Sequence, residues 1–168
     1  MASGAALALA GLALAAPSAE ADVITFYSRL ESASTANKCL GIYGGGTSNG
    51  TLAIQWSCNQ NRDQYWFTES VGNTGGYLLK NLNGLCLEAP GWTNEPGAQL
   101  GQWSCHGGAN QVWHISGEGY GGHRYQKTNS NLCISVEGGS PNNGARIIQW
   151  PCNNAADQYF KVGSIQVG

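Results

Sequence analysis

The sequence predicts an all-β, closed architecture with pseudo-threefold symmetry, and three observations lead to this prediction. The six cysteines of the 168-residue chain form three pairs with an internal spacing of 19, and the pairs recur every 47 residues. Within each unit, short apolar segments alternate with turns rich in Gly, Asn, Ser and Pro, and no long helical pattern occurs. A unit of 47 residues is too small to bury a core of its own, so the three units must share one.

The period of 47 residues also holds at positions other than the cysteines. A tryptophan stands two residues before the second cysteine of every pair: Trp56, Trp103 and Trp150. Further along, a glutamine is followed two residues later by an aromatic side chain: Gln64 and Trp66, Gln111 and Trp113, Gln158 and Phe160. A period held at this many positions indicates a threefold internal repeat, with units at about 23–70, 71–117 and 118–166.

Four short strands are expected in each repeat, or about twelve in all. In the second repeat they cover residues 77–81, 86–89, 99–103 and 112–115, and in the third repeat 124–127, 133–136, 146–150 and 159–162. The first repeat has matching segments at 39–42, 52–56 and 65–67. The turn dipeptides Asn49-Gly50, Pro96-Gly97 and Asn143-Gly144 precede the third strand of each unit.

Six cysteines allow fifteen disulfide pairings, and the repeat favours the one with a bridge inside each unit. These bridges are Cys39–Cys58, Cys86–Cys105 and Cys133–Cys152. The alternative is a metal site, which the spacing does not favour: there is no C-x-x-C pair, and His106, His114 and His123 have no repeating ligand spacing. We therefore expect three disulfides, no metal and no cofactor.

The N-terminal segment is predicted to be a signal peptide covering residues 1–21. Residues 5–16 are almost all Ala, Leu and Gly, a run too short for a bilayer span, which needs about 20 apolar residues. The following Ala19-Glu20-Ala21 suits signal peptidase, with cleavage after Ala21 as first choice and after Ala19 as second. No Lys or Arg precedes the run, and a buried Ala-rich helix is the alternative. We expect residues 22–168 to form a single secreted, extracellular domain without a membrane span.

Composition argues against two large classes of function. Only 11% of residues are charged, and eight Lys and Arg with a net charge of −2 do not supply a basic footprint for nucleic acid. No G-x-S-x-G motif, H-E-x-x-H motif or Gly-rich phosphate loop precedes a helical segment, and six paired cysteines would leave no thiol nucleophile. Glycosidases use two carboxylates across the scissile bond, yet no Asp or Glu position recurs in all three repeats. An enzyme is therefore not expected.

Three segments, at 54–66, 101–113 and 148–160, resemble the Q-x-W repeats of ricin B-type lectin domains, also called R-type lectins or family 13 carbohydrate-binding modules. The resemblance extends over about residues 23–166 and implies a β-trefoil of twelve strands with three potential sugar pockets, one per repeat. In this family the Gln and the last aromatic residue of the motif lie mainly in the shared core. The resemblance implies the same role for Trp66, Trp113 and Phe160.

The sugar pocket of the family resembles a shallow cleft built from four positions in each repeat. They are an acid two residues after the first cysteine, an aromatic two before the second, a polar residue after it, and an Asn or Asp before the Q-x-W glutamine. The second repeat has the full set: Glu88, Trp103, His106 and Asn110. The first and third have Gly41 and Ser135 at the acidic position and keep Trp56, Asn59 and Asp63, and Trp150, Asn153 and Asp157.

These residue types suit a sugar, because a pyranose stacks its C–H face on an aromatic ring and a carboxylate accepts strong hydrogen bonds from neighbouring hydroxyls. Tyr43 and Trp92 are expected to rim the first and second pockets, and the second pocket is expected to bind most tightly. The sequence thus predicts a monomeric, non-catalytic carbohydrate-binding protein with glycan or polysaccharide partners. A trefoil protease inhibitor and an accessory module beside a secreted glycoside hydrolase are the alternatives.

Overall fold

The computed structural model describes residues 26–167 of the chain, so the predicted signal peptide lies outside the described residues. The described part contains twelve strands and five turns of 3-10 helix, each three residues long. The strands are β1 Phe26–Ser32, β2 Lys38–Ile42, β3 Ala53–Ser57, β4 Tyr65–Ser70, β5 Tyr77–Asn81, β6 Leu85–Glu88, β7 Gly101–Ser104, β8 Val112–Gly119, β9 Gly122–Lys127, β10 Leu132–Val136, β11 Ile147–Pro151 and β12 Phe160–Val167. The 3-10 turns are η1 Tyr43–Gly45, η2 Arg62–Gln64, η3 Pro90–Trp92, η4 Glu137–Gly139 and η5 Ala156–Gln158.

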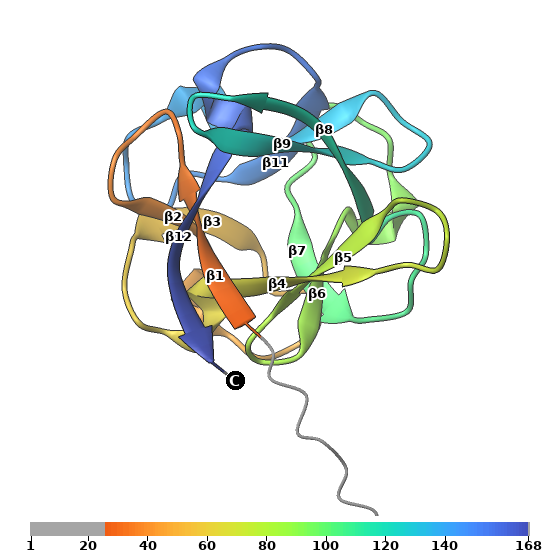
Figure 1. Cartoon of the computed structure of the whole chain (residues 1–168), viewed down its shortest axis with the longest axis horizontal. Helices are drawn as coiled ribbons and strands as arrows, with labels where there is room; N and C mark the ends of the chain where they lie inside the picture. The colour runs from red at the N-terminus through yellow and green to blue at the C-terminus, as the bar shows by residue number, and fades with distance from the viewer. Residues whose placement is uncertain (1–25, 168) are drawn as a thin grey trace, which may run out of the picture.

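Six of the strands close into a barrel. The antiparallel pairs run from β1 to β4, β5, β8, β9 and β12, and β12 returns to pair with β1. Figure 1 shows these strands arranged around the centre of the molecule, with the first strand beside the last. Closure leaves this ring without an exposed sheet edge, and it places equivalent parts of the three repeats around one axis.

The other six strands form three hairpins, β2–β3, β6–β7 and β10–β11, one in each repeat. The hairpins also bond to one another, because single bridges join Leu52 to Gly101, Ile54 to Arg146 and Gln99 to Ile148. This triangle of hairpins is the second element of a β-trefoil. The predicted fold class is therefore confirmed. Strand boundaries differ from the prediction by one or two residues in β3, β7 and β11, whereas β4, β8 and β12 end three to five residues later than predicted.

The shared core is built from sets of equivalent residues, one from each repeat. All of these side chains are buried in one cluster: Leu30, Leu79 and Tyr125; Leu40, Leu87 and Ile134; Ile42, Ala89 and Val136; Ala53, Leu100 and Ile147; Trp66, Trp113 and Phe160. Burial of apolar area on this scale is the main favourable term in folding. The last set confirms the core role expected for the aromatic residues that follow the motif glutamines.

Three disulfides join Cys39 to Cys58, Cys86 to Cys105 and Cys133 to Cys152, as the repeat predicted. Each bridge ties the start of the hairpin in its repeat to the loop that follows the hairpin. The loops that carry the candidate site residues therefore have a covalent anchor at one end. Within residues 26–167 we find no helix with the length and hydropathy needed to cross a bilayer.

Candidate functional site

Each repeat holds its site loop with a buried glutamine that makes the same two hydrogen bonds. The side-chain carbonyl of Gln64, Gln111 and Gln158 accepts the backbone N–H of Asn59, His106 and Asn153, at 2.8, 2.9 and 2.8 Å. The amide of each glutamine donates to the carbonyl of Ser57, Ser104 and Pro151. These contacts fix the loop after the second cysteine and give the motif glutamines the structural role expected for them.

The three tryptophans two residues before the second cysteines all face the surface. Trp56 and Trp103 are each 43% exposed and Trp150 is 44% exposed, so the three repeats present equivalent indole rings. Each ring lies on a rigid hairpin strand, in β3, β7 or β11. A half-exposed aromatic ring on a fixed strand offers an apolar face to a ligand at little cost in conformational entropy.

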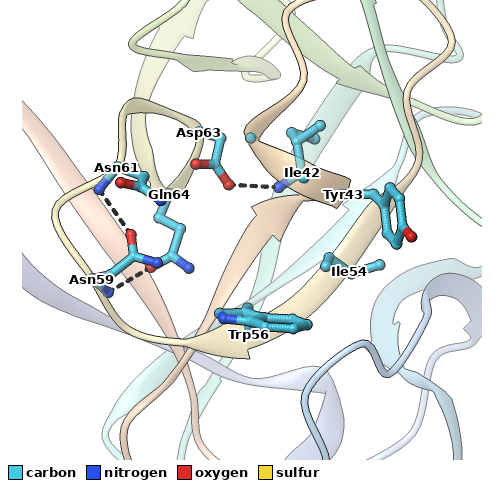
Figure 2. A pocket seen from close by; sticks show the side chains of 10 residues that line it. Ile42, Tyr43, Ile54, Trp56, Asn59, Asn61, Asp63 and Gln64 are labelled. Carbon is cyan, nitrogen blue, oxygen red and sulfur yellow. Dashed lines mark hydrogen bonds between the residues drawn. The ribbon is translucent and has the colours of Figure 1, made fainter.

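The first repeat forms a hollow of about 290 Å³ beside Trp56. Figure 2 shows Trp56 and Tyr43 on two sides of this pocket, with Asn59 and Asp63 on the loop that faces them. The buried carboxylate of Asp63 accepts the backbone N–H of Ile42 through Oδ2, at 2.9 Å. Tyr43 lines this pocket, in agreement with the expectation from the sequence.

Gly41 makes room for the Asp63 carboxylate. A Cβ atom at position 41 would lie 2.9 Å from Asp63 Oδ2 and 3.0 Å from Gln64 Cγ, closer than side chains tolerate. The glycine at the expected acidic position of the first repeat therefore leaves space for a carboxylate that reaches the pocket from the facing loop.

The third repeat repeats this arrangement with a small change. Its hollow, of about 430 Å³, is lined by Trp150, Asn153, Asp157 and Ser135, among other residues. The Ser135 hydroxyl lies 2.5 Å from Asp157 Oδ2, and this pair takes the place of Gly41 and Asp63. Serine is small enough to leave the carboxylate of Asp157 in the pocket wall.

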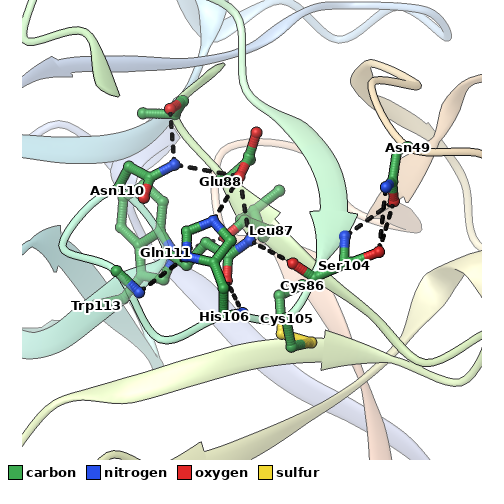
Figure 3. A network of polar contacts seen from close by, with 12 residues as sticks. Asn49, Cys86, Leu87, Glu88, Ser104, Cys105, His106, Asn110, Gln111 and Trp113 are labelled. Atoms are coloured by element: carbon green, nitrogen blue, oxygen red, sulfur yellow. Dashed lines mark hydrogen bonds and ion pairs between the residues drawn. A yellow bond between two sulfur atoms is a disulfide. The ribbon is translucent and has the colours of Figure 1, made fainter. Parts of the chain in front are cut away.

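The second repeat places its carboxylate on the other side. Buried Glu88, at the end of β6, accepts hydrogen bonds at Oε2 from Asn110 Nδ2 and Gln111 Nε2, both at 3.1 Å. His106 Nε2 lies 3.6 Å from the same oxygen. Figure 3 shows the three side chains converging on Glu88. This carboxylate is therefore held in an internal network.

Trp92 covers the imidazole of His106. The two rings are stacked at 5.6 Å between centroids, with 26° between their planes. A hollow of about 120 Å³ lies beside Trp92 and Asn110, but Glu88, Trp103 and His106 do not line it. The full set predicted for the second repeat is thus only partly brought together: Glu88, His106 and Asn110 are in mutual reach, and Trp103 stands apart from the hollow.

Each repeat consequently contains one carboxylate at a pair of facing positions 22 residues apart. The pairs are Gly41 with Asp63, Glu88 with Asn110, and Ser135 with Asp157. From the sequence, Asp63 and Asp157 were expected only as the residue before the motif glutamine, while Gly41 and Ser135 take the position of the acid in their repeats. The spacing of 22 residues within each pair can be read from the sequence, but that the two members of a pair face each other is seen only in the structure.

The polar residue after each second cysteine caps a turn. Asn59 Oδ1 accepts the N–H of Asn61 and Asn153 Oδ1 accepts the N–H of Ala155, both at 2.8 Å. In the second repeat, His106 Nδ1 accepts the N–H of Gly108 at 3.1 Å. The Nδ2 groups of the two asparagines donate to no side chain or backbone group of the described residues. Within residues 26–167, no cluster of His, Cys, Asp and Glu is suited to holding a metal ion.

Solved structures with the same fold include lectins and parts of larger proteins. The chain is 27% identical to a designed threefold-symmetric protein, ThreeFoil, with a TM-score of 0.75 over 83% of this chain and 98% of that one. It has the same identity and TM-score to an exo-β-1,3-galactanase from Clostridium thermocellum, of which it covers 30%. The C-half of an earthworm R-type lectin, solved with GalNAc, is 18% identical, with a TM-score of 0.64 over 86% and 99% of the two chains.

Comparison with curated proteins finds no match. The family model described as the ricin-type beta-trefoil lectin domain, in contrast, matches residues 26–160, which is most of the sequence. The match includes all three hairpins, all three disulfides and every candidate site residue described above. The chain belongs to the family of ricin-type beta-trefoil lectin domains.

Proposed function

We propose that this protein is a secreted, non-catalytic lectin that binds carbohydrate chiefly in the pockets of its first and third repeats. Membership of the ricin-type lectin family supports carbohydrate binding as the general function. The choice of pockets depends on one observation: the same three side-chain types, Trp, Asn and Asp, line two separate hollows at equivalent places in the trefoil.

The chemistry of these pockets suits a neutral pyranose. The indole of Trp56 or Trp150 offers a flat apolar face for the C–H side of the ring. Asp63 uses Oδ2 for the N–H of Ile42, which leaves Oδ1 to accept a sugar hydroxyl. Asn59 uses Oδ1 within its own loop, which leaves Nδ2 to donate to a sugar oxygen.

The second repeat is proposed to bind neutral sugar more weakly than the other two, which reverses the ranking expected from the sequence. That ranking depended on Glu88 as the one acid in a complete set. Asp63 and Asp157 supply equivalent charge in the other repeats, whereas Glu88 Oε2 already accepts two amide donors and faces His106. A sugar hydroxyl would have to displace these partners to reach Oε2, and neither Glu88 nor Trp103 lines the hollow of the second repeat, whereas the first and third pockets each combine their Trp with their Asp.

Secretion and the signal peptide over residues 1–21 remain part of the proposal. Three disulfides support an oxidising compartment. The likeness to part of a galactanase gives specific support to a second candidate function, an accessory binding unit beside a glycoside hydrolase. Both candidates need the same sugar pockets and differ only in the partner. We expect a monomer that binds glycans, with no nucleic-acid partner.

A glycan array probed with the oxidised protein tests the proposal, with a panel of proteases as the parallel assay. The variants are Trp56→Ala, Trp150→Ala and the double variant, with Phe26→Ala as the control for loss of an exposed aromatic side chain outside both pockets. Each single variant should weaken binding to a polysaccharide by about ten-fold, and the double variant should weaken it further, because a chain engages two sites at once.

Protease inhibition without glycan binding would overturn the proposed function. Loss of binding in Trp103→Ala, with Trp56→Ala and Trp150→Ala unchanged, would overturn the assignment of the pockets. Thermal unfolding of each variant separates a lost sugar contact from a lost fold.

A further inference from the structure

Three of the residues that depart from the pseudo-threefold pattern line one hollow between the second and third repeats. The hollow has a volume of about 120 Å³, and the three residues are Trp92, Asn110 and Lys127. Two asparagines, Asn94 and Asn129, also line it. The walls thus combine an aromatic ring, amides and an ammonium group.

Lys127 is a buried cation at a place where the other repeats have neutral residues. It pairs with Trp113 in the barrel, as Asn81 pairs with Trp66 and Ser32 with Phe160. All three polar residues are buried, and Lys127 is only 3% exposed. Since Ser and Asn satisfy this position, the fold does not require a lysine there.

The ammonium group of Lys127 has one hydrogen-bond acceptor, the backbone carbonyl of Thr93. None of the ion pairs among residues 26–167 includes this lysine. A buried ammonium without a carboxylate is unfavourable, and desolvation lowers the pKa of Lys127 accordingly. An anion in the neighbouring hollow would relieve this cost.

Asn110 contributes an unused acceptor to the same hollow. Its Nδ2 donates to Glu88 and to the carbonyl of Ala89, but its buried Oδ1 accepts no hydrogen bond from the described residues. The amide cannot be reversed without turning its oxygen toward the Glu88 carboxylate. Asn110 Oδ1 therefore suits a ligand group that donates, such as a hydroxyl.

Trp92 takes up a backbone conformation that glycine occupies in the other repeats. Its φ is 59°, in the left-handed region, and the equivalent residues Gly45 and Gly139 have φ of 64° and 60°. A bulky residue in this region is rare and points to a specific use for the side chain. Here the exposed indole forms one wall of the hollow.

We propose that this hollow is a separate site for an anionic saccharide, in which Lys127 binds the anionic group and Asn110 Oδ1 accepts a ring hydroxyl. Trp92 packs against the apolar edge of the sugar. A hydroxylated ring that carries a carboxylate or a sulfate supplies a negative charge to Lys127 and a donor to Asn110 Oδ1 at once, whereas a neutral sugar satisfies only the amide. The saccharide class depends on the proposed function, and the preference for an anion depends on Lys127.

The test compares matched pairs of sugars by calorimetry at low salt: glucuronate with glucose, and galacturonate with galactose. Glucose 6-sulfate distinguishes a sulfate from a carboxylate as the preferred group, and acetate reports on the anion alone. We expect the acidic member of at least one pair to bind about ten-fold more tightly than its neutral partner. Equal affinities in the wild-type protein for both pairs and for the sulfate would overturn the proposal without any variant.

Two variants use residues that the other repeats already have at these places. Lys127→Asn copies Asn81, and Trp92→Gly copies Gly45; Lys80→Met is the control for loss of an exposed positive charge on β5. Lys127→Asn should abolish the preference for the acidic sugar, and Lys80→Met should leave it unchanged. An undiminished preference in Lys127→Asn would overturn the proposal.

The same measurements keep the two proposals apart. Trp56→Ala with Trp150→Ala should leave glucuronate binding at the hollow intact, because neither residue lines it. Binding of glucuronate without any neutral glycan would contradict the function proposed for the first and third repeats and support the anionic site.

Discussion

In the first repeat the carboxylate of the pocket comes from the loop after the second cysteine, whereas in the second repeat it comes from a hairpin strand. Asp63 faces Gly41 in one case, and Glu88 faces Asn110 in the other. The backbone plan is the same, with equivalent bridges, glutamines and tryptophans. Only the wall that supplies the charge differs.

The comparison shows that space decides which wall can hold the acid. With Gly41 or Ser135 on the strand, the carboxylate of the facing Asp reaches the strand and stays beside an open hollow. With the longer Glu88 on the strand, the facing residue is an amide that hydrogen-bonds to it. Two acids at facing positions would repel each other at close range in a site of low dielectric constant.

The largest effect is expected from removing a disulfide bridge. Removing the bridge of the first or the second repeat tests whether these repeats are equivalent outside their pockets. Each bridge joins residues 19 positions apart, so replacing either pair Cys39 and Cys58 or pair Cys86 and Cys105 by Ala should lower the free energy of unfolding by about 3 kcal/mol. Urea unfolding of the two double variants measures this. If the two double variants lose unfolding free energies that differ by a factor of two or more, the first and second repeats differ outside their candidate sites as well.

The second-largest effect is expected when a glutamate, as at Glu88 of the second repeat, is introduced at the equivalent position of the first. Gly41→Glu should destabilise the protein by about 2 kcal/mol and abolish sugar binding at Trp56, because its side chain collides with Asp63 and adds a like charge. Adding Asp63→Asn reproduces the pair of the second repeat and should recover part of the stability. Ser135→Gly, the matched control, removes a hydrogen bond to Asp157 without adding bulk or charge, so it should leave sugar binding at Trp56 unchanged. If adding Asp63→Asn to Gly41→Glu restores no stability, the account in which only one of the two facing positions can hold a carboxylate is wrong.

The fold could be predicted from the sequence because it depends on features that recur with one spacing. Cysteines, tryptophans and glutamines 47 residues apart were enough to give three repeats, the bridges and a shared core. The site was less accessible, because it depends on pairs of residues that face each other in space. Asp63 was identified as a candidate, but its place opposite Gly41 became clear only from the geometry of the strand and the loop.

The residues that depart from the threefold pattern between the second and third repeats were harder still to predict. Lys127 stands 46 residues after Asn81, one short of the period, because the turn before Cys133 is one residue longer than the turn before Cys86. Gly45 and Gly139 stand one period before and after Trp92 and suit a left-handed backbone there, but no pattern within the second repeat indicates that a tryptophan adopts it. Such features depend on packing between repeats, which a pattern within one repeat does not contain.

A smaller effect is expected from removing single charges in the two kinds of pocket. Asp63→Asn keeps an acceptor for the N–H of Ile42 but removes the negative charge, so sugar binding at Trp56 should weaken by about ten-fold. Glu88→Gln should weaken binding of neutral sugar by less than about three-fold, because Oε2 already has amide partners. Calorimetric titration of both variants with one neutral sugar from the array measures the difference. A larger loss in Glu88→Gln would restore the ranking expected from the sequence.

The smallest effect concerns the core, where the third repeat has Tyr125 at the place of Leu30 and Leu79. Burial raises the pKa of the Tyr125 phenol to about 12 from 10.0, so the unfolded chain loses this proton first as the pH rises. The contribution of Tyr125 to stability is therefore intact below pH 10 and is lost between about pH 10 and 12, by about 1 kcal/mol at pH 11.

Tyr125→Phe should remove this part of the alkaline loss of stability, measured by urea unfolding at pH 8 and pH 11. Tyr27→Phe is the control, because Tyr27 lies in β1 outside this core cluster. An alkaline loss unchanged in Tyr125→Phe would mean that the phenol titrates alike in the folded and unfolded chains, and that the third repeat does not differ from the first two in this respect.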